Sequence, residues 1–79
     1  MFNNTKYIVF EENFIEEMLI FSPLLQHDYV TRRMNIKPIS AGFITIHDNE
    51  PRCFGKSISL GLESRGEADS KVAKRVLKL

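Results

Sequence analysis

The feature that most constrains this chain is its length, because seventy-nine residues must form a core without covalent cross-links. A folded chain of this size buries only about 60% of the surface that its unfolded form exposes. Cys53 is the single cysteine, so the chain cannot form an internal disulfide, and a cysteine-rich zinc cluster is excluded. We therefore expect one small domain spanning residues 1–79.

The charged side chains nearly cancel, but they are unevenly distributed. Eleven basic and ten acidic residues give a net charge of +1, which argues against nucleic-acid or membrane binding driven by charge. Residues 1–31 carry one basic and five acidic side chains, whereas residues 32–79 carry ten basic and five acidic ones. This asymmetry fits two halves that face each other or two solvated faces. It also fits a local positive site for an anion, formed by the second half and Lys6.

The sequence shows no segment that would direct the chain to a membrane. The first twelve residues, MFNNTKYIVFEE, lack a basic region followed by a long apolar run, so we expect no secretion signal. No apolar run approaches the roughly 20 residues that a membrane-spanning helix needs. We therefore expect a cytoplasmic protein.

Four segments have the composition and length of strands. Residues 7–10 are apolar, β-branched or aromatic, and a polar turn follows at 11–13. Residues 18–21 form a second apolar run, which predicts a strand at 17–21, and a helix over 14–21 is the open alternative. Apolar side chains on both faces of residues 38–47 predict an interior strand. After turn residues at 48–51, a fourth strand begins at 52–54, and the last two strands form a hairpin.

Two helices complete the predicted order. Ser22-Pro23 has the composition of a helix start, and this helix would run to about Met34, before Lys37-Pro38. A second helix follows Ser64 and Glu67, which have the spacing of a capping box. The predicted order is β-β-α-β-β-α, which indicates an α+β domain with two helices and a sheet of about four strands.

The segment Phe54–Leu62 is the strongest candidate for a binding site. Its two glycines bracket a lysine and two serines, so its backbone N–H groups and hydroxyls could surround an anion. The Walker A spacing is absent. The alternative is a strand-to-helix connection without a binding role, in which the serine hydroxyls only form hydrogen bonds with nearby backbone groups. The candidate phosphate-binding residues are Lys6, Lys56, Ser57, Ile58 and Ser59.

Histidine and cysteine give few other candidates. His27 lies in the first helix and could act as a general base or nucleophile, although a lone helical histidine is commonly a boundary residue. His47 borders a turn, and we expect it to be exposed. Cys53 is expected to be a small core residue. Two histidines twenty residues apart do not indicate a metal site, so we expect none.

Several local motifs, in a common order, resemble the phosphohistidine phosphatase (Janus/Ocnus) family. Lys6–Val9 resembles that family's first-strand F-K-Y-V-L segment, and His27–Tyr29 falls where the family has its catalytic histidine, in H-A-D-I-Y. Phe54–Gly61 resembles the family's Y-G-Y-S-M-A-Y-G phosphate loop, and Ala41–Ile44 its G-G-R-I segment. The chain is shorter than the family and is similar to a reduced form of it.

The resemblance implies a phosphatase that acts on phosphorylated histidine without a metal or other cofactor. His27 would be the general base that activates water, Lys6 would offset phosphoryl charge, and Ser57 and Ser59 would hold the phosphoryl oxygens. The ligand would be a phosphorylated protein or a small phosphate compound.

The chain departs from the family where the family has charged residues. Phe43 and Leu19 stand where the family has arginines, and Leu25 stands where it has an acidic residue. A degenerate relative that only binds phosphate is therefore a variant of the same hypothesis. Three other arginines are candidates to replace the missing ones: Arg33, Arg52 and Arg65.

A different class of function stays open. The chain could be a non-enzymatic interaction protein, such as a mobile-element or accessory protein, that dimerises through an exposed sheet edge. Nucleic-acid binding through the basic residues of 32–37 and the last helix is the least favoured hypothesis, because the net charge is small.

Overall fold

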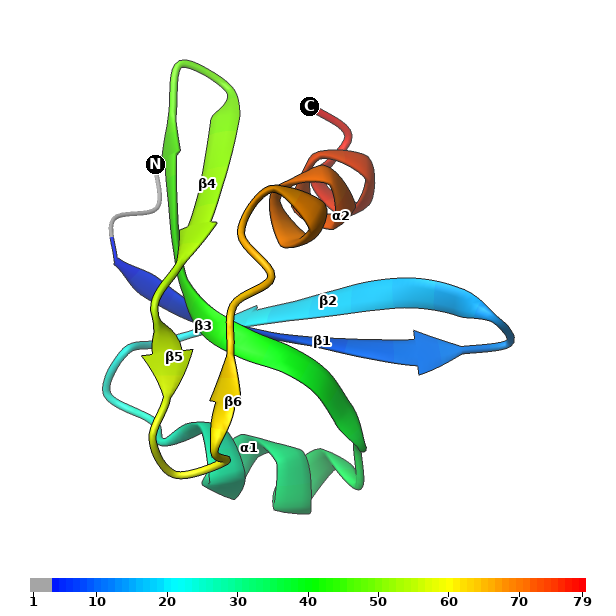
Figure 1. Cartoon of the computed structure of the whole chain (residues 1–79), viewed down its shortest axis with the longest axis vertical. Helices are drawn as coiled ribbons and strands as arrows, with labels where there is room; N and C mark the ends of the chain where they lie inside the picture. The colour runs from blue at the N-terminus through cyan, green and yellow to red at the C-terminus, as the bar shows by residue number, and fades with distance from the viewer. Residues whose placement is uncertain (1–3) are drawn as a thin grey trace.

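The structure is a computed structural model that describes residues 4–79, and its α+β fold confirms the predicted class (Figure 1). A four-stranded antiparallel sheet has the strand order β2-β1-β3-β4, and β5 and β6 form a separate two-stranded sheet. The elements are β1 (Thr5–Glu12), β2 (Ile15–Phe21), α1 (His27–Met34), β3 (Pro38–His47), β4 (Glu50–Phe54), β5 (Lys56–Ser57), β6 (Leu62–Glu63) and α2 (Glu67–Leu77).

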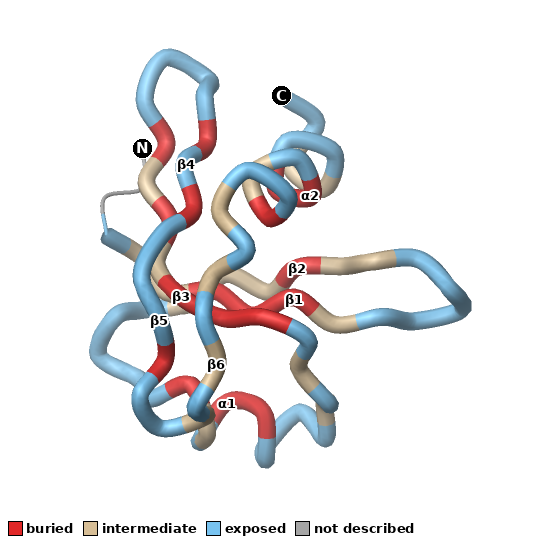
Figure 2. The backbone as a smooth tube through the Cα atoms, in the orientation of Figure 1, coloured by how far each residue is buried: buried red, intermediate tan, exposed pale blue. Residues whose placement is uncertain are grey.

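The two helices cover opposite faces of the sheet, which explains why consecutive residues of β1 are apolar. Tyr7 and Val9 point toward α2, where they pack with Val72. Ile8 points to the other face and packs with Val30 of α1. All three β1 residues are fully buried (Figure 2). The sheet therefore has a core on each side, and β1 contributes to both.

The first hairpin confirms the strand over residues 17–21 and shows that the alternative helix over 14–21 is wrong. β2 pairs with β1 along its whole length, from Ile15 opposite Glu12 to Phe21 opposite Lys6. The turn lies later than the predicted 11–13, because β1 continues to Glu12.

The second hairpin is close to its prediction. β3 covers the expected residues 38–47 and is an interior strand between β1 and β4. Asp48 and Asn49 form the turn with φ angles of 52° and 63°. Both residue types tolerate this left-handed conformation, which two-residue hairpin turns require. β4 begins at Glu50, two residues before the predicted start.

The first helix begins later than Ser22-Pro23, so that prediction of its start is wrong. The Ser22 hydroxyl accepts a hydrogen bond from the Leu24 N–H at 3.1 Å, and the Ser22 carbonyl accepts one from Leu25 at 3.1 Å. Ser22 therefore stabilises a local turn here, and a serine that hydrogen-bonds within such a turn does not cap a helix. The helix starts only at His27.

The predicted connection between β4 and the last helix contains an additional hairpin. β5 and β6 pair through Lys56 with Glu63 and Ser57 with Leu62. Strands of two residues are too short to produce a recognisable periodicity in the sequence.

The last helix exists as predicted, but its capping box does not form. Gly66 occupies the N-cap position, and no side chain caps the helix there. The Ser64 hydroxyl accepts a hydrogen bond from the Gly66 N–H at 2.9 Å, while Glu67 is exposed. Asp69, two residues later, accepts the Arg65 N–H at 2.9 Å. The carboxylate that accepts a backbone N–H at the start of this helix is therefore that of Asp69, whereas the capping box predicted that of Glu67.

Asp69 is fully buried and is the centre of a polar network between α2 and the sheet. Its carboxylate accepts hydrogen bonds from the Tyr7 hydroxyl at 2.5 Å and the Ser40 hydroxyl at 2.9 Å. The Arg65 Nε donates to it at 2.7 Å, and the same guanidinium binds Glu16 of β2 at 2.8 Å and 3.0 Å. Burial alone would raise the pKa of Asp69, but these donors outweigh it, and the pKa lies below its ordinary value.

We predict that Asp69→Asn destabilises the fold by about 3 kcal/mol, because an amide cannot accept from all of these donors and leaves Arg65 with less compensation. Urea unfolding at neutral pH measures the loss. The matched control is Asp48→Asn at an exposed turn, which should change stability by less than about 0.5 kcal/mol.

The same carboxyl gives a pH dependence with a definite sign. Because its folded pKa is depressed, its contribution is present above the unfolded value of about 3.9 and is lost as the pH falls through the folded pKa. Asp69→Asn should therefore flatten the acid branch of the stability curve. Equal acid branches for the variant and the wild type would contradict this account.

Candidate functional site

The residues proposed from the sequence as a site line one cleft. Its volume is about 520 Å³, and it lies where the first strand, the start of α1 and the β5 loop meet. All six predicted site residues line it, together with Gln26 and Phe43: Lys6, His27, Lys56, Ser57, Ile58 and Ser59. The structure thus brings together three segments that are far apart in the sequence.

His27 is the first residue of α1 and is only 3% exposed. Its Nε2 lies 2.9 Å from the Gly42 carbonyl oxygen. A carbonyl can only accept, so Nε2 carries the proton and Nδ1 keeps the free lone pair. The ring meets Phe21 and Phe43 edge-on, at centroid distances of 5.5 Å and 6.0 Å. Packing and the hydrogen bond therefore fix both the orientation and the tautomer.

The environment of His27 favours the neutral ring. Burial lowers its pKa below the ordinary value, and the nearby charge of Lys6 acts in the same direction. The Gly42 hydrogen bond and Asp28 oppose this effect without reversing it. A neutral imidazole with one free lone pair has the form that a general base needs.

Gly42 was not singled out as a site residue, although a glycine within a strand is a signal of close backbone approach. A Cβ at this position would lie 2.5 Å from the Phe54 carbonyl oxygen and 3.1 Å from the Ser64 Cβ. Only glycine therefore lets β3 approach the end of β4 this closely. The same residue supplies the carbonyl that orients His27.

Lys6 brings a positive charge to the cleft from the beginning of β1. Its Nζ donates a hydrogen bond to the Leu25 carbonyl at 2.8 Å, which holds the loop before α1 against the strand. An ammonium group has three donors, so two of them stay available for a ligand. Among residues 4–79, neither Lys6 nor Lys56 forms an ion pair with an acidic side chain.

The two serines connect the loop after β5 to the start of α1. Ser57 is buried, and its hydroxyl accepts from the Leu60 N–H at 3.2 Å. The Ser59 hydroxyl accepts from the Asp28 N–H at 3.2 Å, so this loop caps the helix that the Ser22 turn leaves uncapped. The two hydroxyl oxygens lie 3.4 Å apart. Ile58, between them, points outward and is 87% exposed.

None of the three arginines considered as replacements lines the cleft. Arg65 is bound to Glu16 and Asp69. Arg52 lies on β4 and lines other hollows, and Arg33 is exposed on α1. Phe43 is itself a wall of the cleft. The positive charge of the cleft therefore comes from its lysines.

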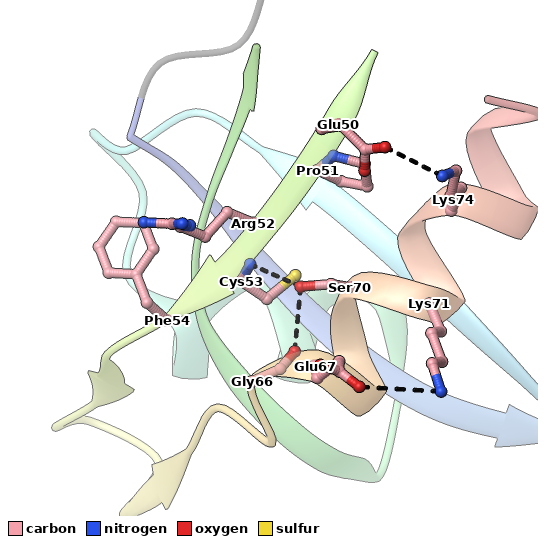
Figure 3. A pocket seen from close by; sticks show the side chains of 10 residues that line it. All are labelled: Glu50, Pro51, Arg52, Cys53, Phe54, Gly66, Glu67, Ser70, Lys71 and Lys74. Carbon is pink, nitrogen blue, oxygen red and sulfur yellow. Dashed lines mark hydrogen bonds and ion pairs between the residues drawn. The ribbon is translucent and has the colours of Figure 1, made fainter. Parts of the chain in front are cut away.

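A second hollow, between β4 and α2, has a different electrostatic character (Figure 3). Its volume is about 500 Å³, and both of its lysines are paired: Lys71 with Glu67 at 3.9 Å and Lys74 with Glu50 at 3.2 Å. The Ser70 hydroxyl accepts from the Cys53 N–H at 2.9 Å. Both lysines of this hollow have acidic partners and two carboxylates line it, whereas none lines the His27 cleft, so it is a weaker candidate for an anion site even though Arg52 also lines it.

Residues 4–79 contain no group of three or more histidine, cysteine or acidic side chains placed to hold a metal ion. Neither of the helices within this range is long and apolar enough to cross a membrane.

We predict that the stability of the fold falls as the pH decreases below about 6.5, because the unfolded chain can protonate His27 at that pH while the folded chain resists it. Urea unfolding between pH 7.5 and pH 5 measures this slope. His27→Gln should remove most of it, since the amide can still donate to Gly42 but does not titrate. His47→Gln, at the exposed turn, should leave it in place; the reverse pattern would contradict the account.

Comparisons of the chain with protein-family models, with curated proteins and with solved structures found no match.

Proposed function

We propose that the cleft around His27 binds a phosphoryl group and that the chain is a small metal-independent phosphohydrolase, acting on phosphorus–nitrogen bonds such as that of phosphohistidine. A variant of this proposal is a relative that has kept phosphate binding and lost hydrolysis. Both rest on the same cleft, and they differ only in the chemistry of His27.

The observation that carries the proposal is the convergence of chemically suited residues from separate segments. Lys6, His27 and the loop 56–59 line one hollow although they come from the first strand, the first helix and a short hairpin. Packing alone does not require two lysines, a neutral histidine and two hydroxyls to share a cleft.

The charge of the lining fits an anion. The described residues of the cleft include two lysines and no carboxylate. Hydrogen bonds between an ammonium and a phosphoryl oxygen are charge-assisted and are roughly twice as strong as neutral ones. Positioning and charge stabilisation are the main needs of phosphoryl transfer, since the reaction requires little covalent chemistry from the protein.

His27 can supply the remaining step. A water molecule attacks phosphorus while Nδ1 accepts one of its protons, so that a P–O bond forms as the P–N bond breaks. The leaving nitrogen lies on the opposite side of phosphorus and takes its proton from a solvent water, while Nδ1 releases its proton to solvent and the ring returns to its neutral form. The depressed pKa of His27 keeps the ring neutral at the start of the cycle. Phosphoramidates are labile, so this limited assistance is sufficient.

We predict that the wild type releases phosphate from phosphohistidine or phospholysine, and that His27→Gln slows release by about 100-fold or more because the general base is lost. Lys6→Met should mainly weaken substrate binding and raise KM. Phosphate release under single-turnover and steady-state conditions measures both effects, and urea unfolding shows whether each variant is folded.

His47→Gln is the matched control, since it changes an exposed histidine that lies outside the cleft. Retention of full activity by folded His27→Gln would refute the role of His27. A wild type that releases no phosphate but binds it would establish the binding-only variant, and one that does neither would refute the proposal.

A further inference from the structure

The turn between β1 and β2 breaks a local rule of hairpin chemistry. Asn13 and Phe14 form a two-residue connection with φ angles of 54° and 66°. Such a turn needs positive φ at both positions, and glycine is strongly favoured at the second one. A bulky residue is strained in this conformation. Phe14 is also 95% exposed, so burial within its own chain does not compensate for the strain.

A hollow with an apolar floor lies next to this turn. Its volume is about 550 Å³, and Val72 and Ala68 of α2 line it, together with Lys71 and Arg75. Phe14 and Ile15 border it from the hairpin side. The tip of the hairpin extends away from α1 and the small sheet, and it is exposed throughout (Figure 2). An aromatic side chain and a hollow suited to one thus belong to a single patch of surface.

The charges around the patch are complementary. Glu11 and Glu12 are exposed on the hairpin, and neither forms an ion pair within residues 4–79. Beyond the first turn of α2, the exposed charges of the helix and of its C-cap residue are all basic: Lys71, Lys74, Arg75 and the C-cap Lys78. Lys71 and Lys74 are paired with the exposed Glu67 and Glu50, whereas Arg75 and Lys78 form no ion pair within residues 4–79. The helix surface therefore keeps an excess of positive charge that matches the acidic hairpin of another copy.

We propose that two copies of this chain form a two-fold dimer in which Phe14 of each copy enters the hollow between the hairpin and α2 of the other. Because a two-fold axis brings the same patch of both copies together, a patch that contains both the insert and its receptor is self-complementary and closes as a dimer. Glu11 and Glu12 of one copy then lie beside Lys71 of the other. The dimer surface is distinct from the His27 cleft.

The edges of the sheet are less suited to pairing between copies. In β4, Pro51 has no N–H, and the outward N–H of Cys53 is already bound to Ser70. In β2, the Glu16 carbonyl accepts a hydrogen bond from Arg75. Both edges are therefore partly blocked, as is usual where a protein avoids strand-to-strand association.

The test is sedimentation of the wild type and of Phe14→Gly over a concentration series. We expect the wild type to dimerise and Phe14→Gly to weaken dimerisation by at least about 100-fold, since each dimer loses two aromatic anchors. Glycine relieves the strained turn, so the melting temperature of the monomeric variant should equal or exceed that of the wild-type monomer. Leu24→Gly, which removes another exposed apolar side chain outside the patch, should dimerise like the wild type.

A charge exchange tests the orientation of the two copies. Glu12→Lys should weaken the dimer, and Glu12→Lys combined with Lys71→Glu should restore it. A wild type that stays monomeric at every concentration would overturn the proposal. So would a dimer that survives Phe14→Gly, or a Phe14→Gly monomer that melts below the wild-type monomer, because Phe14 would then support the fold of its own chain.

Discussion

The buried carboxylate of Asp69 is the interaction on which the arrangement of the chain most depends. It accepts hydrogen bonds from β1 through Tyr7, from β3 through Ser40, and from Arg65, which lies two residues before α2. Arg65 extends the network to Glu16 of β2. A small core supplies only about 3–5 kcal/mol of stability. A fully hydrogen-bonded network that holds α2 against three strands therefore contributes strongly to the selection of one folded structure.

β1 connects this network to the candidate site. Its alternating side chains place Tyr7 on the α2 face and Ile8 on the α1 face, and Lys6, one residue earlier, reaches the cleft. The Lys6 ammonium holds the loop before α1, and the Ser59 hydroxyl caps α1 from the other side. The start of α1, where His27 lies, is therefore fixed by residues that are distant in sequence. The fold and the proposed chemistry of the cleft therefore both depend on β1.

Sequence patterns predicted the elements that are long and periodic, and failed where tertiary partners replaced local ones. The strand over 38–47 was predicted correctly, because its length and apolar faces are visible in the sequence. Ser22 and Ser64 were wrongly predicted as helix caps, since each hydroxyl accepts a hydrogen bond from the backbone N–H two residues later, before the helix begins. The burial of Asp69 was not visible, because its donors come from β1 and β3. In the cleft, six of the eight lining residues are those that the motifs had singled out, while Gln26 and Phe43 had not been predicted to line it. The contact of Gly42 with His27 depends on the packing of β3 against β4, which the sequence does not show.

The most direct measurement of the central claim is a titration of the isotopically labelled chain with inorganic phosphate, followed by amide NMR. Binding in the cleft predicts saturable shifts of the Lys56–Leu60 amides and of Asp28, whose N–H is bound to the Ser59 hydroxyl. Lys6→Met should weaken these shifts, while Lys74→Met, in the other hollow, should leave them unchanged. The absence of saturable shifts in the 56–60 loop, or shifts confined to α2, would contradict the claim that this cleft binds phosphate.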